Sequence, residues 1–174
     1  PKFNQTIMRI NKDMRFAKGE PYRNYLLIHF GKFKMDSEFF VYFDANECQI
    51  GLFINASNGN EFYFKQNLSK YKNEISEVCK QYKINQNHSL YELNKAPDLV
   101  INNFNFDEHF NTLAKFKMII LQKIITPNQL KIFGPEFLSE SVKIFYTLYP
   151  LYCFAISDNP LSLLDKFEET FVSE

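Results

Sequence analysis

The chain has few glycines, and this scarcity limits the phosphate sites that it can build. Only five of its 174 residues are glycine, and neither GxGxxG nor GxxxxGK followed by Ser or Thr occurs. Both loops need glycine where the backbone comes close to phosphate oxygens. The sequence therefore excludes a dinucleotide-binding loop of the Rossmann type and a Walker-type loop.

Cysteine is also rare, and its spacing argues against a thiolate metal site. Cys48, Cys79 and Cys153 form no CxxC pair, whereas zinc sites built on thiolates use closely spaced pairs. We expect reduced, mostly buried thiols. No GxSxG nucleophile motif occurs. The three histidines, His29, His88 and His109, have no other metal-ligating residue at the spacing of a metal site. We therefore expect neither a bound metal nor a cofactor.

The chain lacks a net charge and a long apolar run. Twenty Lys and Arg balance twenty Asp and Glu, which argues against a globally basic nucleic-acid binder. Apolar stretches such as Met118–Leu121 and Phe145–Ile156 are too short or too polar to cross a bilayer, and no signal peptide is recognisable. We expect a cytoplasmic protein without a membrane partner. Because the chain begins at Pro1, a trimmed chain or a segment of a longer one stays an open alternative.

Aromatic residues are abundant even though tryptophan is absent. Twenty Phe and ten Tyr make up 17% of the chain, and 45% of all residues are apolar. A chain of this length and composition can bury a core without disulfides or metals. We expect one domain over residues 1–174, with much of its interior built from aromatic rings.

Short strands are predicted first along the chain. Tyr25–Phe30, Phe39–Phe43 and Gln49–Ile54 are rich in aromatic and branched residues and are separated by polar breaks, which is typical of an antiparallel meander. Thr6–Ile10 reads as a further short strand, and Glu61–Lys65 as either a strand or the approach to a helix.

Helical spacing dominates afterwards. Apolar residues fall at this spacing from Leu68 to Tyr82, and Thr126-Pro127 is typical of a helix start. Pro150 is expected to kink or interrupt the helix around it. Two further segments are predicted as helices, Asp107–Phe116 and Pro160–Phe171. The apolar run Met118–Ile125 is too short for its spacing to distinguish a strand from a helix. The pattern predicts an α+β fold in which an antiparallel sheet from the N-terminal half is packed by helices from the C-terminal half.

Positive charge is concentrated near the N-terminus. Residues 1–35 carry eight Lys and Arg against two Asp and Glu. Guanidinium groups bind phosphate and carboxylate oxygens in a planar fork. We therefore expect a binding domain whose basic loop takes an anionic partner, either a phosphate-bearing ligand or nucleic acid. The residues expected to bind are Arg9, Lys12, Asp13, Arg15, Lys18, Tyr22 and Arg23.

Other interpretations of the same residues stay open. Asp13 could form an ion pair with Arg9 or Arg15 that only holds the loop in place. Such a pair stabilises a protein little when it is exposed on the surface. Alternatively, the Arg, Asp and Tyr side chains serve an enzyme acting on a phosphorylated or nucleotide substrate. The segments Phe39–Phe43 and Phe62–Phe64 are aromatic on both faces. Either both faces are covered, or one binds a protein partner or a second copy of the chain.

The block Arg9–Lys18, followed by Pro21–Arg23, resembles the signature of DUF2461, a bacterial family without a settled activity. FFVYFDANECQIGLFI, LAKFKM and SVKIFYTLYPLYCF are similar to later stretches of that family, so the resemblance spans about residues 6–156. It implies a fold rather than a reaction. The family's opening helical segment is not seen here, and no His-Pro follows Lys95–Asp98. A site held by those parts in other members is not expected in this chain.

Overall fold

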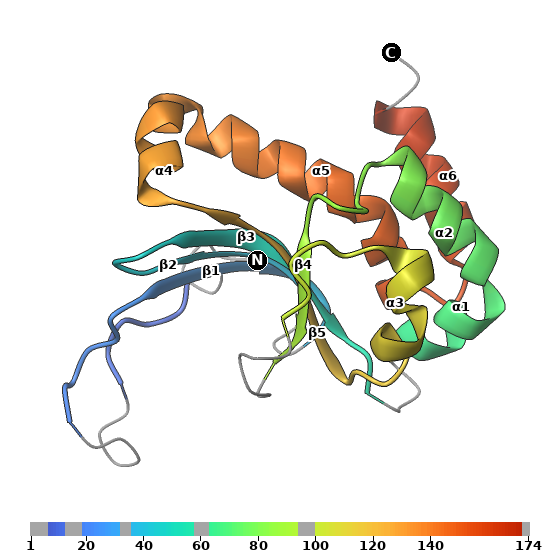
Figure 1. Cartoon of the computed structure of the whole chain (residues 1–174), viewed down its shortest axis with the longest axis horizontal. Helices are drawn as coiled ribbons and strands as arrows, with labels where there is room; N and C mark the ends of the chain where they lie inside the picture. Colours follow the sequence, from blue (N-terminus) through green and yellow to red (C-terminus); the bar gives the residue numbers. More distant parts are fainter. Residues whose placement is uncertain (1–6, 13–18, 32–35, 58–62, 94–99, 172–174) are drawn as a thin grey trace.

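A five-stranded antiparallel sheet forms one layer of the molecule (Figure 1). The computed structural model describes residues 7–12, 19–31, 36–57, 63–93 and 100–171. The strand order is β1-β2-β3-β5-β4. The strands are β1 (Leu26–Gly31), β2 (Glu38–Phe43), β3 (Cys48–Asn55), β4 (Ser89–Glu92) and β5 (Met118–Ile125).

Helices cover one face of this sheet. In Figure 1, α5 crosses above the strands, and α1, α2, α3 and α6 gather beyond one end of the sheet. This arrangement confirms the predicted α+β fold, in which a sheet from the N-terminal half is packed by later helices. The helices are α1 (Phe64–Lys70), α2 (Lys72–Gln81), α3 (Phe106–Leu113), α4 (Pro127–Phe133), the short 3-10 helix η3 (Gly134–Glu136), α5 (Phe137–Ile156) and α6 (Pro160–Phe171).

The predicted meander is confirmed as β1, β2 and β3, each paired with the next. The unassigned run Met118–Ile125 is a strand, since it pairs with β3 along its whole length and with β4 on its other side. β4 was not predicted from the sequence. It is only four residues long and obtains its partner from β5, about thirty residues later in the chain. Of the range Glu61–Lys65, predicted as a strand or the approach to a helix, residues 61–62 lie outside the described residues, and α1 begins at Phe64.

The helix expected from Leu68 to Tyr82 is divided into α1 and α2. Tyr71 separates them, because its φ of −119° and ψ of 36° are not helical. The start of α4 is confirmed, with Thr126 and Gln129 forming a reciprocal capping box. Of the two effects expected at Pro150, a kink or an interruption, the interruption is wrong, because α5 continues to Ile156 with Pro150 inside it and buried. Burial of the surrounding helix offsets the hydrogen bond that proline cannot make.

The main core lies between α5 and the sheet. Leu52 and Leu121 face each other across β3 and β5 and are at most 1% exposed. Phe39 of β2 packs on Tyr152 of α5, with ring centroids 4.9 Å apart. The cysteines are buried and unbridged, as expected, and burial raises the pKa of each thiol: Cys48, Cys79 and Cys153.

A smaller apolar cluster lies on the opposite face of the sheet, which we call the second face. Phe40, Phe53 and Ile120 form its centre and are 6–7% exposed. Strand neighbours point to opposite sides, and both Phe39 and Phe40 are buried. Within the described ranges, no helix combines the length and the apolarity needed to cross a membrane.

Candidate functional site

A cavity of about 480 Å³ lies on the second face. Its walls are mostly apolar, with a few polar groups at the margins. Size and lining of this kind are typical of small-molecule sites. The lining residues are Met8, Leu27, His29, Glu38, Phe40, Tyr42, Gln49, Phe53, Tyr91, Leu93 and Ile120.

Strand register shows which residues lie side by side on the second face. Phe40 is paired with His29 on one side and with Gly51 on the other, and Gly51 is paired with Gln122. These residues form one row across the second face. Gly51 carries no side chain in this row, and a Cβ there would lie 2.3 Å from the carbonyl oxygen of Leu121, so the backbone of β5 approaches β3 closely at this point.

His29 and Glu38 form a polar pair at one end of the cavity. His29 Nδ1 lies 3.0 Å from Glu38 Oε2, and their side chains are only 22% and 16% exposed. Burial raises the pKa of Glu38, although the adjacent His29 opposes this shift. Gly31 is the cross-strand partner of Glu38, and a Cβ there would lie 2.6 Å from Glu38 Cβ. Glycine therefore leaves the room that Glu38 occupies.

Tyr42 lines the other end of the cavity, and Tyr25 packs behind it. Tyr42 donates to Asp44 Oδ2 at 3.1 Å, and burial together with this carboxylate raises the pKa of Tyr42 to about 12. The Tyr25 ring lies 5.3 Å from the Tyr42 ring. Arg23 donates to Tyr25 Oη at 2.7 Å, with its guanidinium 5.5 Å from the ring centroid. The Arg23 cation is thus linked to the cavity through Tyr25, which contacts the lining residue Tyr42.

This cation belongs to an antiparallel arrangement of residues 7–12 with residues 21–28, which we call the basic strand pair. Backbone N–H groups of Met8, Lys12 and Arg23 donate to carbonyls of the opposite segment at 2.8–2.9 Å. Met8 also lines the cavity, and Tyr25 Oη lies 3.8 Å from its sulfur. The basic strand pair therefore continues the sheet beyond β1 and contributes to one wall of the cavity.

The predicted binding residues are only partly brought together. The bridge between Asn11 and Tyr22 places these two on one side, so their neighbours Lys12 and Arg23 point to the other. Tyr22 is 60% exposed and does not line the cavity. Arg9 is exposed, and its carbonyl accepts from Arg23 Nε at 3.3 Å.

The other predicted residues, Asp13, Arg15 and Lys18, lie outside the described residues. Among the carboxylates that the structure describes, none forms an ion pair with Arg9, Lys12 or Arg23. For these three, the described part of the chain does not supply the pinning carboxylate considered from the sequence.

The sequence did not single out the polar cavity residues. The sequence predicts no ligand role for His29, and it marks Tyr42 only as part of the aromatic segment Phe39–Phe43; Glu38 and Gln49 carry no signal in it. The signal in the sequence that could have indicated this site is His29, a polar residue within the otherwise apolar strand Tyr25–Phe30. The pairing of His29 with Glu38, however, depends on the register of β1 with β2, which follows from folding.

Comparison with known proteins identifies the family. A model described as a conserved hypothetical protein (DUF2461) matches residues 1–154. No curated protein and no solved structure matches the chain. The description of the family gives no reaction or ligand, so any function has to be argued from the site. Because the match covers most of the chain, as the block around Arg9–Lys18 had indicated, the chain belongs to the DUF2461 family.

Proposed function

We propose that this chain is a binding domain for a small, largely apolar molecule that carries one anionic group. The apolar part occupies the cavity on the second face, and the anionic group meets Lys12 and Arg23 of the basic strand pair. The observation that carries the proposal is the continuity of the two features. Met8 and Tyr42 line the cavity, and both contact Tyr25, which holds Arg23.

The polar groups give the ligand a direction. Glu38 and Tyr42 are four residues apart on β2 and on the same face, which separates them by about 13 Å along the strand. Each end has a carboxylate, Glu38 at one and Asp44 at the other, but Asp44 is partly exposed to solvent and accepts from Tyr42. In the described part of the chain, only the Tyr42 end also has an arginine, which attracts an anion. The anionic group therefore points toward Tyr42 and Arg23, and a neutral or hydrogen-bonding end points toward His29 and Glu38.

A phosphate, sulfonate or carboxylate group satisfies this requirement. A small ligand is favoured over nucleic acid, because the chain has no net charge and the apolar walls are poorly suited to a sugar-phosphate backbone. The enzyme alternative has no comparable support, since it needs Asp13, Arg15 and Tyr22 around one pocket, and of these only Tyr22 is described and it is exposed.

Two related fluorescent probes test this proposal. Anilinonaphthalene sulfonate and phenylnaphthylamine share an aromatic body, and only the first carries an anionic group. We expect the sulfonate to bind with about tenfold lower Kd at low salt, because one charge-assisted contact is worth roughly 1.4 kcal/mol or more. Added salt should weaken the binding of the sulfonate and leave the Kd of the neutral probe nearly unchanged. Fluorescence titration measures both.

Matched variants assign the two contributions. Leu27→Phe narrows the cavity and should weaken both probes. The double change Lys12→Gln with Arg23→Gln should weaken only the sulfonate. Lys115→Gln with Lys131→Gln removes the same charge from exposed positions that do not line the cavity and should change neither. Equal Kd values for the two probes, or a sulfonate affinity unaffected by the first double change, would contradict the proposal.

A further inference from the structure

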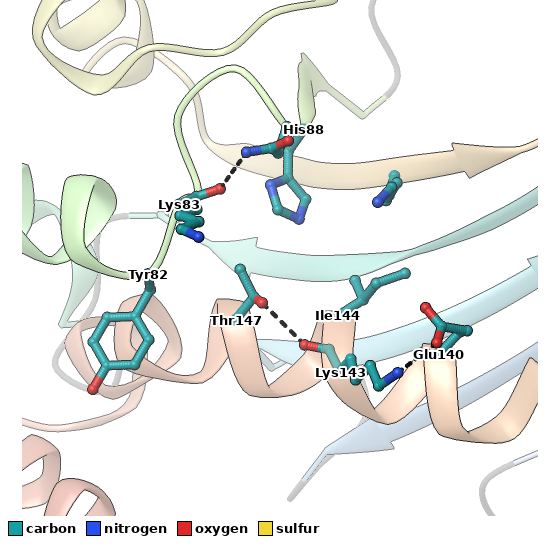
Figure 2. A pocket seen from close by; sticks show the side chains of 9 residues that line it. Tyr82, Lys83, His88, Glu140, Lys143, Ile144 and Thr147 are labelled. Carbon is teal, nitrogen blue, oxygen red and sulfur yellow. Dashed lines mark hydrogen bonds and ion pairs between the residues drawn. The ribbon is translucent and has the colours of Figure 1, made fainter. Parts of the chain in front are cut away.

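A second pocket lies on the helix side of the sheet, away from the cavity of the proposed function. It has a volume of about 240 Å³ and lies where the loop between α2 and β4 meets α5 and β5. Figure 2 shows its lining side chains, with Lys83 and His88 on the loop side and Lys143 and Thr147 on α5. Lys123 of β5 also lines it.

His88 is the unusual group in this pocket. Its side chain is 4% exposed, and Nδ1 lies 3.1 Å from the carbonyl oxygen of Ile84. A carbonyl only accepts, so Nδ1 of the neutral ring carries the proton and Nε2 presents a lone pair. Nε2 is fully buried and has no hydrogen-bond partner in the described part of the chain. Buried polar atoms are nearly always paired.

Figure 2 shows the imidazole of His88 directed from the loop toward α5, above Thr147 and Ile144. The orphaned nitrogen therefore belongs to the pocket. A ligand that donates a hydrogen bond to it would remove the cost of leaving a buried acceptor unpaired.

The loop that carries His88 holds an uncommon backbone conformation. Lys83 and Gln86 have φ values of 54° and 64°, which side chains other than glycine rarely adopt. The Asn87 side chain fixes the loop by donating to the carbonyl of Lys83 at 2.8 Å. At Lys83 this positive-φ conformation is a common way for a helix to end, since α2 ends just before it and the N–H of Ile84 donates to the carbonyl of Cys79 at 2.9 Å. The loop places Lys83 and His88 at the same pocket.

The charges around His88 are mainly positive. Lys83 faces the pocket from the loop, Lys123 from β5, and Lys143 with Glu140 from α5. Glu140 is committed to Lys143 at 2.7 Å. Among the residues that line the pocket, three ammonium groups stand against one carboxylate. Glu168, which accepts from Tyr82 at 2.8 Å, and Glu136, whose charge acts on Lys143, lie outside the lining. Burial and the nearby Lys123 lower the pKa of His88, so the free pocket contains a neutral imidazole at neutral pH.

We propose that this pocket binds a small phosphate anion whose P–OH group donates to His88 Nε2 while its other oxygens accept from the surrounding lysines. The volume is below that of drug-sized sites, which fits an inorganic phosphate or the phosphate head of a small monoester. This site is independent of the cavity on the second face and does not rest on the function proposed for it.

Sulfate is the decisive comparison. Hydrogen phosphate and sulfate carry the same charge at about pH 8 and have similar size, but only hydrogen phosphate has a proton to donate. An acceptor at His88 Nε2 therefore distinguishes them, and lysines alone do not. We expect phosphate to bind at least about tenfold tighter than sulfate by calorimetric titration, since one buried hydrogen bond to an anion is worth roughly 1.5–3 kcal/mol.

Substitutions separate the contributions. His88→Asn keeps an amide able to donate to the Ile84 carbonyl but removes Nε2, so phosphate and sulfate should then bind within about twofold of each other. Lys123→Gln should weaken phosphate by about tenfold. Glu140→Gln removes the carboxylate beside Lys143 and should strengthen phosphate severalfold, a gain that damage to the fold cannot produce. Lys115→Gln, at an exposed position outside the pocket, should change nothing.

Phenyl phosphate identifies the source of the anion. A second hollow, lined in part by Tyr82 and Tyr146, shares Tyr82, Lys83 and Thr147 with the pocket. At about pH 6, close to the second pKa of monoesters, half of this probe retains its proton. Tighter binding than inorganic phosphate would indicate a monoester, and weaker binding would indicate free phosphate; both agree with the proposal.

Two outcomes would overturn the proposal. One is the absence of saturable phosphate binding to the wild-type chain. The other is an equal affinity for phosphate and sulfate while His88 is present. If His88→Asn does not fold, nitrogen NMR of the wild-type imidazole decides: the His88 Nε2 resonance has to shift on phosphate addition and not on sulfate addition.

Discussion

Replacing Asn67 with aspartate is expected to lower the free energy of unfolding by about 4 kcal/mol. Asn67 lies on α1, and its side chain is 3% exposed. Its Nδ2 donates to the carbonyl oxygens of Phe154 at 2.9 Å and Ser157 at 2.7 Å. Carbonyls at the end of a helix have no donor within that helix. Asn67 therefore supplies, from far away in the sequence, the donors that the end of α5 requires.

Aspartate has nearly the same shape as asparagine but no N–H group. Its carboxylate would face two carbonyl oxygens in a buried position, with the charge uncompensated. Because burial raises the pKa of such a carboxyl, the native state would hold its proton to higher pH than the unfolded chain does. The stability lost should therefore grow as the pH rises from about 4 toward neutral.

Urea unfolding of the variants measures this effect. Asn67→Ala removes the same donors without adding charge and is expected to cost about 2–3 kcal/mol, less than Asn67→Asp. Asn73→Asp makes the same change on the exposed surface of α2 and should stay within about 0.5 kcal/mol of wild type. A cost below about 1 kcal/mol for Asn67→Asp would show that this contact does not secure α5.

The elements that the sequence predicted correctly are those whose signal is local. The strands β1 to β3 alternate short aromatic runs with polar breaks, and the start of α4 is marked by Thr126, Pro127 and Gln129 within four positions. β4 escaped prediction because its four residues become a strand only through pairing with β5. The failed interruption at Pro150 has the same cause, since tertiary burial of α5 outweighs a local rule.

The candidate sites divide along the same line. The basic segment was visible in the sequence because its charges lie within fifteen residues, and the structure places Lys12 and Arg23 on one side of it. The two pockets were not visible. His29 and Glu38 meet through strand register, and His88 meets Lys123 and Lys143 only after α2, β5 and α5 have packed. Residues that are ordinary in isolation acquire chemistry from their distant neighbours.

The two pockets lie on opposite faces of one sheet, and β3 and β5 form the middle of that sheet. Ile120 of β5 lines the cavity on the second face, whereas Lys123 of the same strand lines the lysine pocket. Residues an odd number apart on a strand point to opposite faces. The spacing of β3 and β5 therefore supports both pockets, and a change that forces these strands apart should disturb both.

Gly51→Ala is such a change, and it is expected to destabilise the fold by about 3 kcal/mol. A Cβ at Gly51 would lie 2.3 Å from the carbonyl oxygen of Leu121 and 2.8 Å from the Cα of Gln122. Both are backbone atoms of β5, so no rotation of a side chain relieves the clash. β3 is held between β2 and β5, and it cannot move away from one partner without pressing on the other.

Gly31→Ala provides the matched comparison. A Cβ there would lie 2.6 Å from the Cβ of Glu38, which is a comparable clash in distance. Gly31, however, is the last residue of β1, where the strand can shift more freely. We therefore expect a smaller cost of about 1 kcal/mol in urea unfolding. Equal losses for the two variants would mean that clash distance alone sets the cost, and that confinement between two strands does not hold β3 and β5 at the spacing on which both pockets depend.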